Sequence, residues 1–417
     1  MPNRAQNSAG VAHRLPGRER RLDSGMPNRA FLMVLAAGAV ASGPAAAQPD
    51  LTGTVFVDRN GNGTRDAGEA GLAGVAVSDQ HEVAVTRADG TFRISHSLGT
   101  GVVYVSVPDG FRSVGPFWRK ADSAAAERGF LFPLAPAPAP ADFIFVHASD
   151  THISPASLAR TQRLRAVVDS IKPAFVLVTG DLIRDALRVG EAEATGYYDL
   201  FRSEREQFTA PVWTVPGNHE VFGIERHLSL VSPEHPLYAR GMYHHYFGPD
   251  YYSFTYGGVH FVGLNTVDID DLWYYGHVDS LQAEWLSRDL AAVPAGVPVV
   301  TFNHIPFFTS VETLDGYRSE QPAPTSITVR GKTSFRHAVS NAGDIIARIT
   351  QGHPYDLALG GHMHVREQLR YEGSPIRFFQ TGAVVGPSDG AGLKLTSGVV
   401  VYRVRNGRID DGTFIPL

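Results

Sequence analysis

The chain has 417 residues, of which 43% are hydrophobic and 19% charged, so it can bury the cores of two or three globular domains. It has no cysteine, which excludes disulfides and thiolate metal sites and leaves nitrogen and oxygen ligands of the kind that Mn, Fe or Zn accept. The formal charge is −5, and an acidic chain is a poor nucleic-acid binder by its overall field.

Residues 1–47 have the pattern of a secretory signal peptide, which is removed from the mature protein. Arg29 precedes a short apolar run at 31–40, and Ala45-Ala46-Ala47 offers an A-x-A cleavage site. The tetrapeptide Met-Pro-Asn-Arg occurs twice, and its second copy makes Met26 a candidate start. Removal of the peptide takes away six arginines and two acidic residues, which changes the formal charge to −9. We therefore expect a periplasmic or secreted protein with no membrane span in the mature chain and no nucleic-acid-binding surface.

Residues 51–57 alternate and are rich in β-formers, which predicts a strand, and we expect residues 50–133 to form a small β-sandwich domain. Within them, residues 58–69 match the twelve-residue calcium loop of EF-hands, including the glycine at its sixth position. Apolar β segments rather than helices flank this loop, so the match is to its coordination chemistry and not to the EF-hand fold. The alternative is a plain turn that binds nothing. The candidate calcium ligands are Asp58, Asn60, Asn62, Asp66 and Glu69.

Alternating prolines and alanines at 133–141 predict a semi-rigid extended linker, because proline cannot continue a helix or donate to a strand ladder. In residues 142–417, strand patterns alternate with helical ones, which favours an α/β domain. Ligands of such sheets gather beyond the carboxyl ends of the strands.

Five apolar runs in this second domain each end in side chains that can hold a metal. The runs begin near residues 143, 175, 212, 297 and 357, and the side chains that follow them are Asp150 with His152, then Asp181, Asn218, His304, and His362 with His364. Seven such ligands are too many for one ion, but two ions that share a bridging carboxylate could use them, and Asp181 on its Gly-Asp turn suits the bridge. Two cations about 3.5–4 Å apart would clamp a phosphoryl group and lower the pKa of a bridging water. His219 is left over and could protonate a leaving oxygen as general acid.

The ordered blocks Asp-x-His, Gly-Asp, Gly-Asn-His-Glu, His and Gly-His-x-His, which span 150–364, resemble the calcineurin-like metallophosphoesterase superfamily. The front domain resembles that of a bacterial branch of this superfamily with an N-terminal β-sandwich. The resemblance implies two packed mixed β-sheets flanked by helices, and His219 as the residue that protonates the leaving group. It also implies one metal held by Asp150, His152, Asp181 and His364, and a second held by Asp181, Asn218, His304 and His362.

The sequence departs from many relatives three residues after the bridging aspartate, where an Asp that could orient the catalytic histidine is replaced by Arg184. Either Asp185 or Glu220 could orient His219 instead, or His219 lacks a partner. Two aromatic- and histidine-rich segments, at 238–254 and 273–277, could line a substrate cleft or pack between the sheets. Their candidate substrate residues are His244, His245 and His277.

Together these patterns predict a periplasmic or secreted hydrolase of small phosphomonoesters or phosphodiesters that acts through a metal-activated water. Its cofactors would be two ions of Mn, Fe or Zn, with a candidate Ca²⁺ in the front domain. One alternative is a catalytically inactive surface binding protein built on a phosphatase fold. Another is a metal-dependent hydrolase of a different bond, such as an amide.

Overall fold

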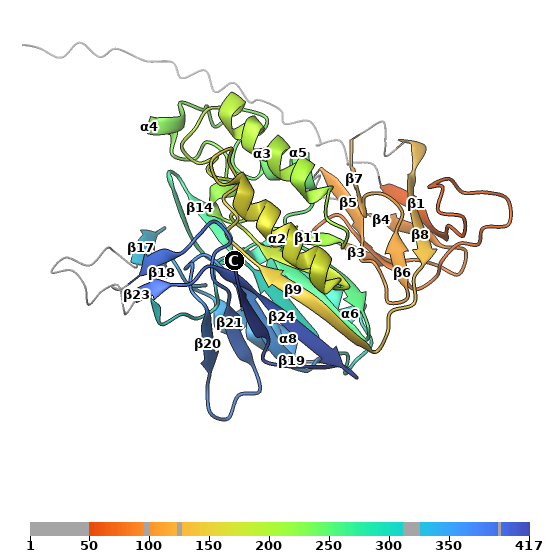
Figure 1. Cartoon of the computed structure of the whole chain (residues 1–417). Helices are drawn as coiled ribbons and strands as arrows, with labels where there is room; N and C mark the ends of the chain where they lie inside the picture. Colours follow the sequence, from red (N-terminus) through yellow and green to blue (C-terminus); the bar gives the residue numbers. More distant parts are fainter. Residues whose placement is uncertain (1–49, 96–100, 123–126, 312–325, 391–392) are drawn as a thin grey trace, which may run out of the picture. The chain divides into compact units, whose positions relative to one another are not determined.

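The computed structural model describes residues 50–95, 101–122, 127–311, 326–390 and 393–417 (Figure 1). The predicted signal peptide and the alternative start at Met26 lie outside the described residues, so both stay predictions. In the part of the chain that the structure describes, no helix is long and apolar enough to cross a membrane.

Two six-stranded mixed sheets form the larger part of the described chain, as the sequence predicted. The first has the order β11-β10-β9-β24-β25, with β26 paired to β24, and its strands are β9 (Asp142–Ala148), β10 (Phe175–Thr179), β11 (Val212–Val215), β24 (Gly398–Arg405), β25 (Arg408–Ile409) and β26 (Thr413–Pro416). The second has the order β12-β13-β16-β19-β21-β20, and its strands are β12 (Tyr252–Tyr256), β13 (Val259–Leu264), β16 (Val299–Asn303), β19 (Tyr355–Gly360), β20 (Glu367–Arg370) and β21 (Arg377–Gln380).

The two sheets face each other across an aromatic core. Phe175 of the first sheet and Phe261 of the second lie edge to face with ring centroids 5.1 Å apart, and Phe254 stacks on Phe261 at the same distance. Both β-branched and aromatic residues fill these strands, which suits surfaces that are buried on one or both faces. The strands β9, β10 and β11 run parallel, as do β13, β16, β19 and β21, so their carboxyl ends point to one edge of each sheet.

Helices cover the outer faces of both sheets (Figure 1). Those beside the first sheet bury Leu164, Val168, Tyr198 and Phe201 in one cluster with the strand residues Val146 and Val178. The helices are α2 (Leu158–Ile171), α3 (Glu191–Arg205), the 3-10 turn η1 (Asn218–Glu220), α4 (Arg226–Ser229), α5 (Gly241–Phe247), α6 (Ser280–Ala291) and α8 (Ala342–Thr350). Three hairpins complete the described elements of this larger region: β14 (Val267–Asp270) with β15 (Trp273–Gly276), β17 (Ser326–Val329) with β18 (Lys332–Phe335), and β22 (Ser388–Gly390) with β23 (Leu393–Leu395).

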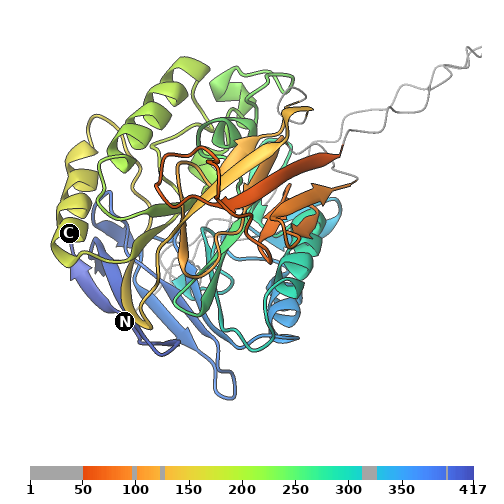
Figure 2. The same cartoon turned by 90° about the vertical axis from the view of Figure 1, so that its right-hand side faces the viewer.

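The front region, residues 50–136, forms two further four-stranded sheets, which is consistent with a small all-β domain (Figure 2). One sheet has the order β4-β1-β8-β6, with β1 (Leu51–Val57), β4 (Thr91–Ile94), β6 (Phe111–Ser113) and β8 (Phe130–Pro136). The other has the order β3-β2-β5-β7, with β2 (Ala76–Ser78), β3 (Val83–Val85), β5 (Val102–Val105) and β7 (Trp118–Lys120).

The predicted linker at 133–141 is shorter in the structure, because β8 continues to Pro136 through the first prolines. Pro133 lies opposite Phe56 in a parallel ladder, and its carbonyl oxygen accepts a hydrogen bond from Val114. The backbone N–H and C=O groups of one strand residue point toward the same neighbouring strand. A proline is therefore tolerated in a strand where its nitrogen would not have to donate a hydrogen bond. Only residues 137–141 connect the two regions.

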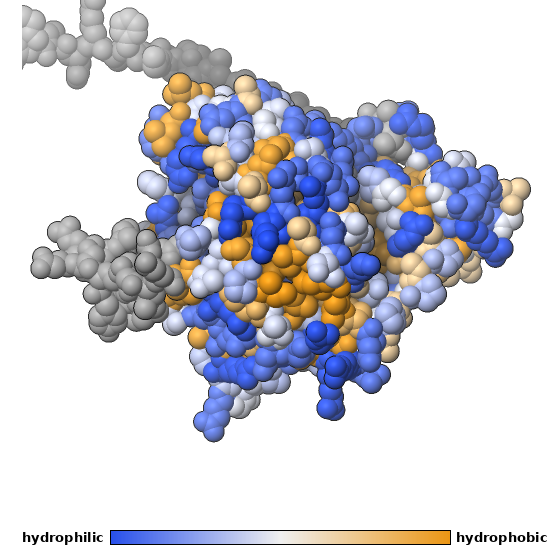
Figure 3. All heavy atoms as spheres, in the orientation of Figure 1, coloured by the Kyte–Doolittle hydropathy of each residue, from blue (hydrophilic) through white to orange (hydrophobic). Residues whose placement is uncertain are grey.

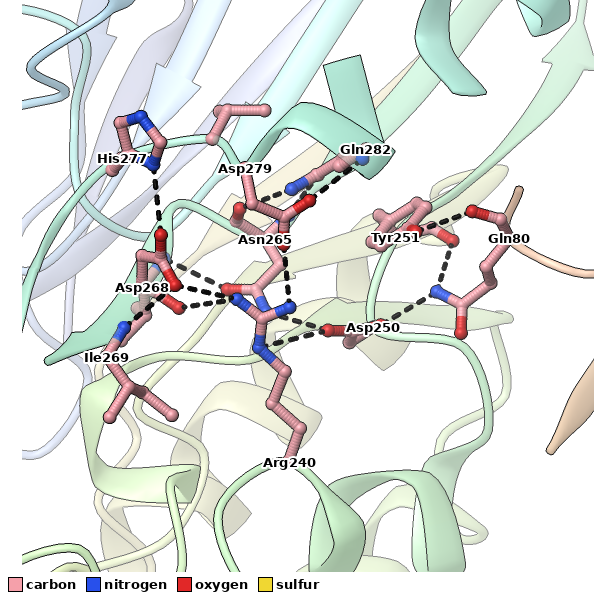
Figure 4. Close-up of polar contacts among 12 residues, drawn as sticks. Gln80, Arg240, Asp250, Tyr251, Asn265, Asp268, Ile269, His277, Asp279 and Gln282 are labelled. Carbon is pink, nitrogen blue, oxygen red and sulfur yellow. Dashed lines mark hydrogen bonds and ion pairs between the residues drawn. The ribbon is translucent and has the colours of Figure 1, made fainter. Parts of the chain in front are cut away.

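The front region and the larger region share a hydrophobic core rather than meeting only through that connection. Val77 and Tyr104 belong to the same buried cluster as Phe254 and Phe302. A buried polar contact accompanies it: Gln80 donates to Asp250 Oδ1 at 2.7 Å, and the hydroxyl of Tyr251 donates to the carbonyl oxygen of Gln80 at 2.5 Å (Figure 4).

The candidate calcium loop folds on its own hydrogen bonds. Both carboxylate oxygens of the buried Asp58 accept from backbone N–H groups of Gly61 and Gly63, and Glu69 accepts from Arg59 and Asp66. Calcium binding by the loop stays a prediction.

Candidate metal centre

The seven predicted metal ligands stand just beyond the carboxyl ends of β9, β10, β11, β16 and β19. Five of them have a backbone in the left-handed region, which non-glycine residues rarely adopt and which clusters at functional sites. Their φ angles are 54° for Asp150, 38° for His152, 48° for Asp181, 71° for His362 and 55° for His364. The buried surroundings hold these turns in a conformation that directs the side chains to one place.

One group of ligand atoms, all within 4.8 Å of one another, comes from Asp150, His152, Asp181 and His364. Nε2 of His364 lies 3.2 Å from Asp150 Oδ1, and Nε2 of His152 lies 3.2 Å from Nε2 of His364. Nε2 of His152 also lies 3.5 Å from Asp181 Oδ2. Two ring nitrogens and two carboxylates converge on one point, as the ligands of a single cation would.

A second such group comes from Asp181, His304 and His362. Nε2 of His304 lies 3.2 Å from Asp181 Oδ1, 3.1 Å from Nδ1 of His362 and 3.2 Å from Oδ1 of Asn218. Asp181 thus turns one oxygen toward each group, and Asn218 adds its amide oxygen to the second. The structure brings together all seven side chains that the sequence pointed to.

The electrostatics of the cluster keep its aspartates ionised and several of its histidines neutral. Burial opposes the charge of Asp181, but the imidazoles of His304 and His219 outweigh it, and the pKa of this carboxyl lies well below its usual range. Burial lowers the pKa of His152 to about 4. For His304, burial is outweighed by the adjacent Asp181, which raises the pKa of the imidazole to about 9. A concentration of shifted groups of this kind is typical of functional sites.

These residues fit a pair of transition-metal ions. Oδ1 of Asp150 is fully buried and accepts no hydrogen bond from any residue that the structure describes, so a cation would satisfy it. Imidazole, carboxylate and amide oxygen donors suit Mn, Fe or Zn. The outer nitrogens are also held: Nδ1 of His304 donates to the carbonyl oxygen of Thr179 at 2.8 Å, and Nε2 of His362 is hydrogen-bonded to Nδ1 of His337 at 2.7 Å. Such outer contacts orient metal-binding imidazoles.

His219 lies at the edge of this centre and its ring is held by a backbone group. Nδ1 donates to the carbonyl oxygen of Arg184 at 2.5 Å, while Nε2 lies 3.9 Å from Asp181 Oδ2. Its ring stands perpendicular to that of His152, with centroids 4.5 Å apart. The orienting partner is therefore neither of the two carboxylates that the sequence suggested, because a main-chain carbonyl occupies that position.

The two rejected orienting carboxylates have other partners. Glu220 is buried and accepts from the backbone N–H groups of Ile183 and Gly217, at 3.0 and 2.6 Å, so it ties together the turns that carry Asp181 and Asn218. Burial, followed by repulsion from Asp181, raises the pKa of Glu220 to about 8. The remaining one, Asp185, accepts from the backbone N–H of Leu187 and pairs with Arg188 at 3.0 Å.

The other candidate substrate residues lie outside both ligand groups. Nε2 of His244 contacts Asp250 at 2.9 Å, and Nδ1 of His277 contacts Asp268 at 3.0 Å. These two aspartates belong to the network around Arg240 that Figure 4 shows. His245 instead lies 3.3 Å from the ammonium of Lys120. The contacts of these three histidines are with structural partners, and their predicted role in substrate binding finds no support among them.

Sequence reasoning missed two residues beside His362. One is His337, described above, and the other is Arg336, whose guanidinium lies over the rings of Trp273 and Tyr274 at 5.3 and 5.0 Å. Tyr274 in turn meets the ring of His362 edge-on at 6.0 Å. In the sequence, only the aromatic segment at 273–277 indicated a role near the site. Arg336 and His337 belong to no recognisable motif.

The two shared-ligand clusters at the sheet edge define a candidate dinuclear hydrolase centre, and comparison with known proteins gives the family. The model of the calcineurin-like phosphoesterase family matches residues 143–366, more than half of the chain. The chain therefore belongs to the calcineurin-like phosphoesterases. The comparison with curated proteins found no match.

The solved structures that match this chain are distant from it in sequence. A dimetal phosphatase from Danio rerio is 14% identical, with a TM-score of 0.43, and the match covers 66% of this chain and 98% of that one. The phosphopantetheinyl hydrolase of Mycobacterium tuberculosis is 15% identical, with a TM-score of 0.34 over 58% of this chain and 91% of that one. GAP50 of Plasmodium is 13% identical, with a TM-score of 0.40 over 66% and 84%.

Proposed function

We propose that the chain is a dinuclear-metal phosphoesterase that is exported to the periplasm or secreted and hydrolyses a small phosphomonoester or phosphodiester. The observation that carries the proposal is the position of Asp181, whose two oxygens turn to two separate ligand groups. When bound, two such ions would polarise a phosphoryl group and supply a nucleophilic water at neutral pH.

His219 would act as the proton donor. Because its Nδ1 proton is committed to the carbonyl oxygen of Arg184, the proton that can be transferred is the one on Nε2. That nitrogen faces Asp181 and the ring of His152, and so faces the centre.

The test is hydrolysis of p-nitrophenyl phosphate and bis(p-nitrophenyl) phosphate by the full chain, after chelation and after reconstitution with Mn²⁺, Fe²⁺ or Zn²⁺. Activity should disappear on chelation and return with at least one of these ions. His364→Asn should abolish it, whereas His227→Asn, on an exposed histidine outside the centre, should not. Full metal loading without hydrolysis of either ester would favour the inactive binding protein instead.

Export is tested by the amino terminus of the protein recovered outside the cytoplasm. Cleavage after the Ala45-Ala46-Ala47 segment would leave Gln48 as the first residue. Recovery of the chain only from the cytoplasm, with residues before Gln48 intact, would contradict this part of the proposal.

A further inference from the structure

A cavity of about 850 Å³ opens between the front region and the helices α3 and α5, and nothing in the proposed hydrolysis uses it. In Figure 3, hydrophobic residues are visible in the recess between these two parts of the chain. Six partly exposed aromatic side chains line the cavity: Phe111, Trp118, Phe208, Trp213, Tyr246 and Tyr256. A volume of roughly 300–1,000 Å³ with apolar and aromatic walls is typical of small-molecule sites.

The aromatic walls are fixed by packing. Trp213 stacks on the buried Phe254 with ring centroids 4.2 Å apart and planes 10° from parallel, and Phe117 lies 5.1 Å from it. Trp118 lies against the backbone of Gly248, where an added Cβ would come within 2.6 Å of its Cγ. Flat rings held in this way form a preformed surface, so a ligand would lose little affinity to ordering them.

The charges around the cavity are opposite to those of the chain as a whole. Among the described residues, its lining includes Arg112, Arg202 and Arg205 but only one acidic residue, Glu206, in a chain of net charge −5. Arg202 pairs with Asp199 at 2.7 Å and, like Arg205, holds its guanidinium over an aromatic ring of α5. The excess positive charge favours an anionic group on whatever enters the cavity.

The cavity is separate from the metal centre. Its wall includes Phe175 and Val212, the first residues of β10 and β11. The metal ligands Asp181 and Asn218 follow the opposite ends of the same two strands. At about 3.3 Å of rise per residue, this separation is roughly 15–20 Å.

We propose that this cavity is a second binding site, for a small amphiphilic anion with a flat aromatic body and one carboxylate, sulfonate or phosphate group. The aromatic body would stack on the tryptophan and tyrosine walls, as aromatic pairs do. The anionic group would meet the guanidinium groups of Arg112 and Arg202 at the rim.

The probe for this site is 1-anilinonaphthalene-8-sulfonate, titrated by fluorescence into the full chain with inorganic phosphate in excess to occupy the metal centre. Trp118→Ala should weaken its binding at least tenfold, and the double variant Arg112→Gln/Arg202→Gln at least fivefold. Tyr371→Ala and Arg163→Gln alter an exposed aromatic residue and an exposed arginine outside the cavity and should change the Kd by less than twofold. Hydrolysis of p-nitrophenyl phosphate should be unchanged in all of these variants.

The uncharged analogue N-phenyl-1-naphthylamine separates the contribution of the aromatic wall to binding affinity from that of the arginine charges. It should bind the wild-type chain more weakly than the sulfonate, and the double arginine variant should bind the two probes equally. Equal binding of both probes by the wild-type chain, or sulfonate binding that neither variant weakens, would overturn the proposal. If Trp118→Ala does not fold, the double arginine variant decides, because it leaves the aromatic wall intact.

Discussion

Gly217→Ala should disable the metal centre by collision alone. The φ of Gly217 is −102°, which alanine adopts freely, so the backbone imposes no cost. A Cβ there, however, would lie 2.9 Å from Cγ of Asp181 and closer still to its amide nitrogen and Oδ1. Ordinary contact begins at about 3.4 Å, so the turn and the shared aspartate must separate by roughly 1 Å.

Such a shift has a size that can be worked out. Overpacking of this kind costs about 1–3 kcal/mol of folding free energy. A misplacement of about 1 Å at a reacting centre costs on the order of 10²-fold in rate. We therefore expect Gly217→Ala to lose about 100-fold in kcat/KM for p-nitrophenyl phosphate and to retain less metal after dialysis.

The assay compares kcat/KM, metal content by mass spectrometry and the free energy of unfolding with those of a matched glycine variant. Gly196 lies exposed within α3, and no atom of the described residues lies within 4 Å of a Cβ built there. Gly196→Ala should keep full activity and gain about 0.5–1 kcal/mol of stability. Wild-type turnover and metal content in Gly217→Ala would refute the position assigned to Asp181.

Three further predictions concern single histidines. His219→Ala should keep both metals and lose rate by roughly 10²–10⁴-fold, most for alkyl esters and least for p-nitrophenyl phosphate; an equal loss for all leaving groups would exclude a proton-donating role. His337→Ala, which frees the outer nitrogen of His362, should lower metal affinity about 10–100-fold in a chelator titration, and unaltered affinity would show that the contact is incidental. Burial lowers the pKa of His147 to about 3, so the stability that this neutral imidazole contributes is complete above pH 6.5 and is lost as the pH falls toward 3. His147→Gln, which can still bond Thr179, should reduce the fall in unfolding free energy between pH 6.5 and 4, and identical slopes would contradict this.

The metal ligands could be predicted because each of them follows a buried strand. An apolar run locates the strand, and parallel strands bring their carboxyl ends to one edge of the sheet, so residues as distant as Asp150 and His364 meet. The alternation of strand and helix patterns predicted an α/β domain, whereas its division into two packed sheets was predicted from the family resemblance. The ligand predictions rested on one local pattern, an apolar run followed by Asp, Asn or His, which the sequence repeats five times.

Contacts that depend on tertiary position gave no such signal. The partner of His219 is the main-chain carbonyl of Arg184, and any residue at that position offers the same atom. His244 looked like a candidate substrate residue because its buried partner Asp250 could not be foreseen. Likewise, Pro133 suggested a linker because the sequence does not show which face of a strand needs its nitrogen.

The central claim is that one carboxylate is shared by two metal ions, and metal content per chain tests it most directly. Wild-type chain should bind two ions and hydrolyse p-nitrophenyl phosphate. Asp181→Asn should bind at most one ion and show no turnover, because a neutral amide bridges two cations poorly. Asp185→Asn removes a nearby carboxylate that lies outside both ligand groups and should keep both ions and the activity. Two ions per chain and near wild-type turnover in Asp181→Asn would contradict the account.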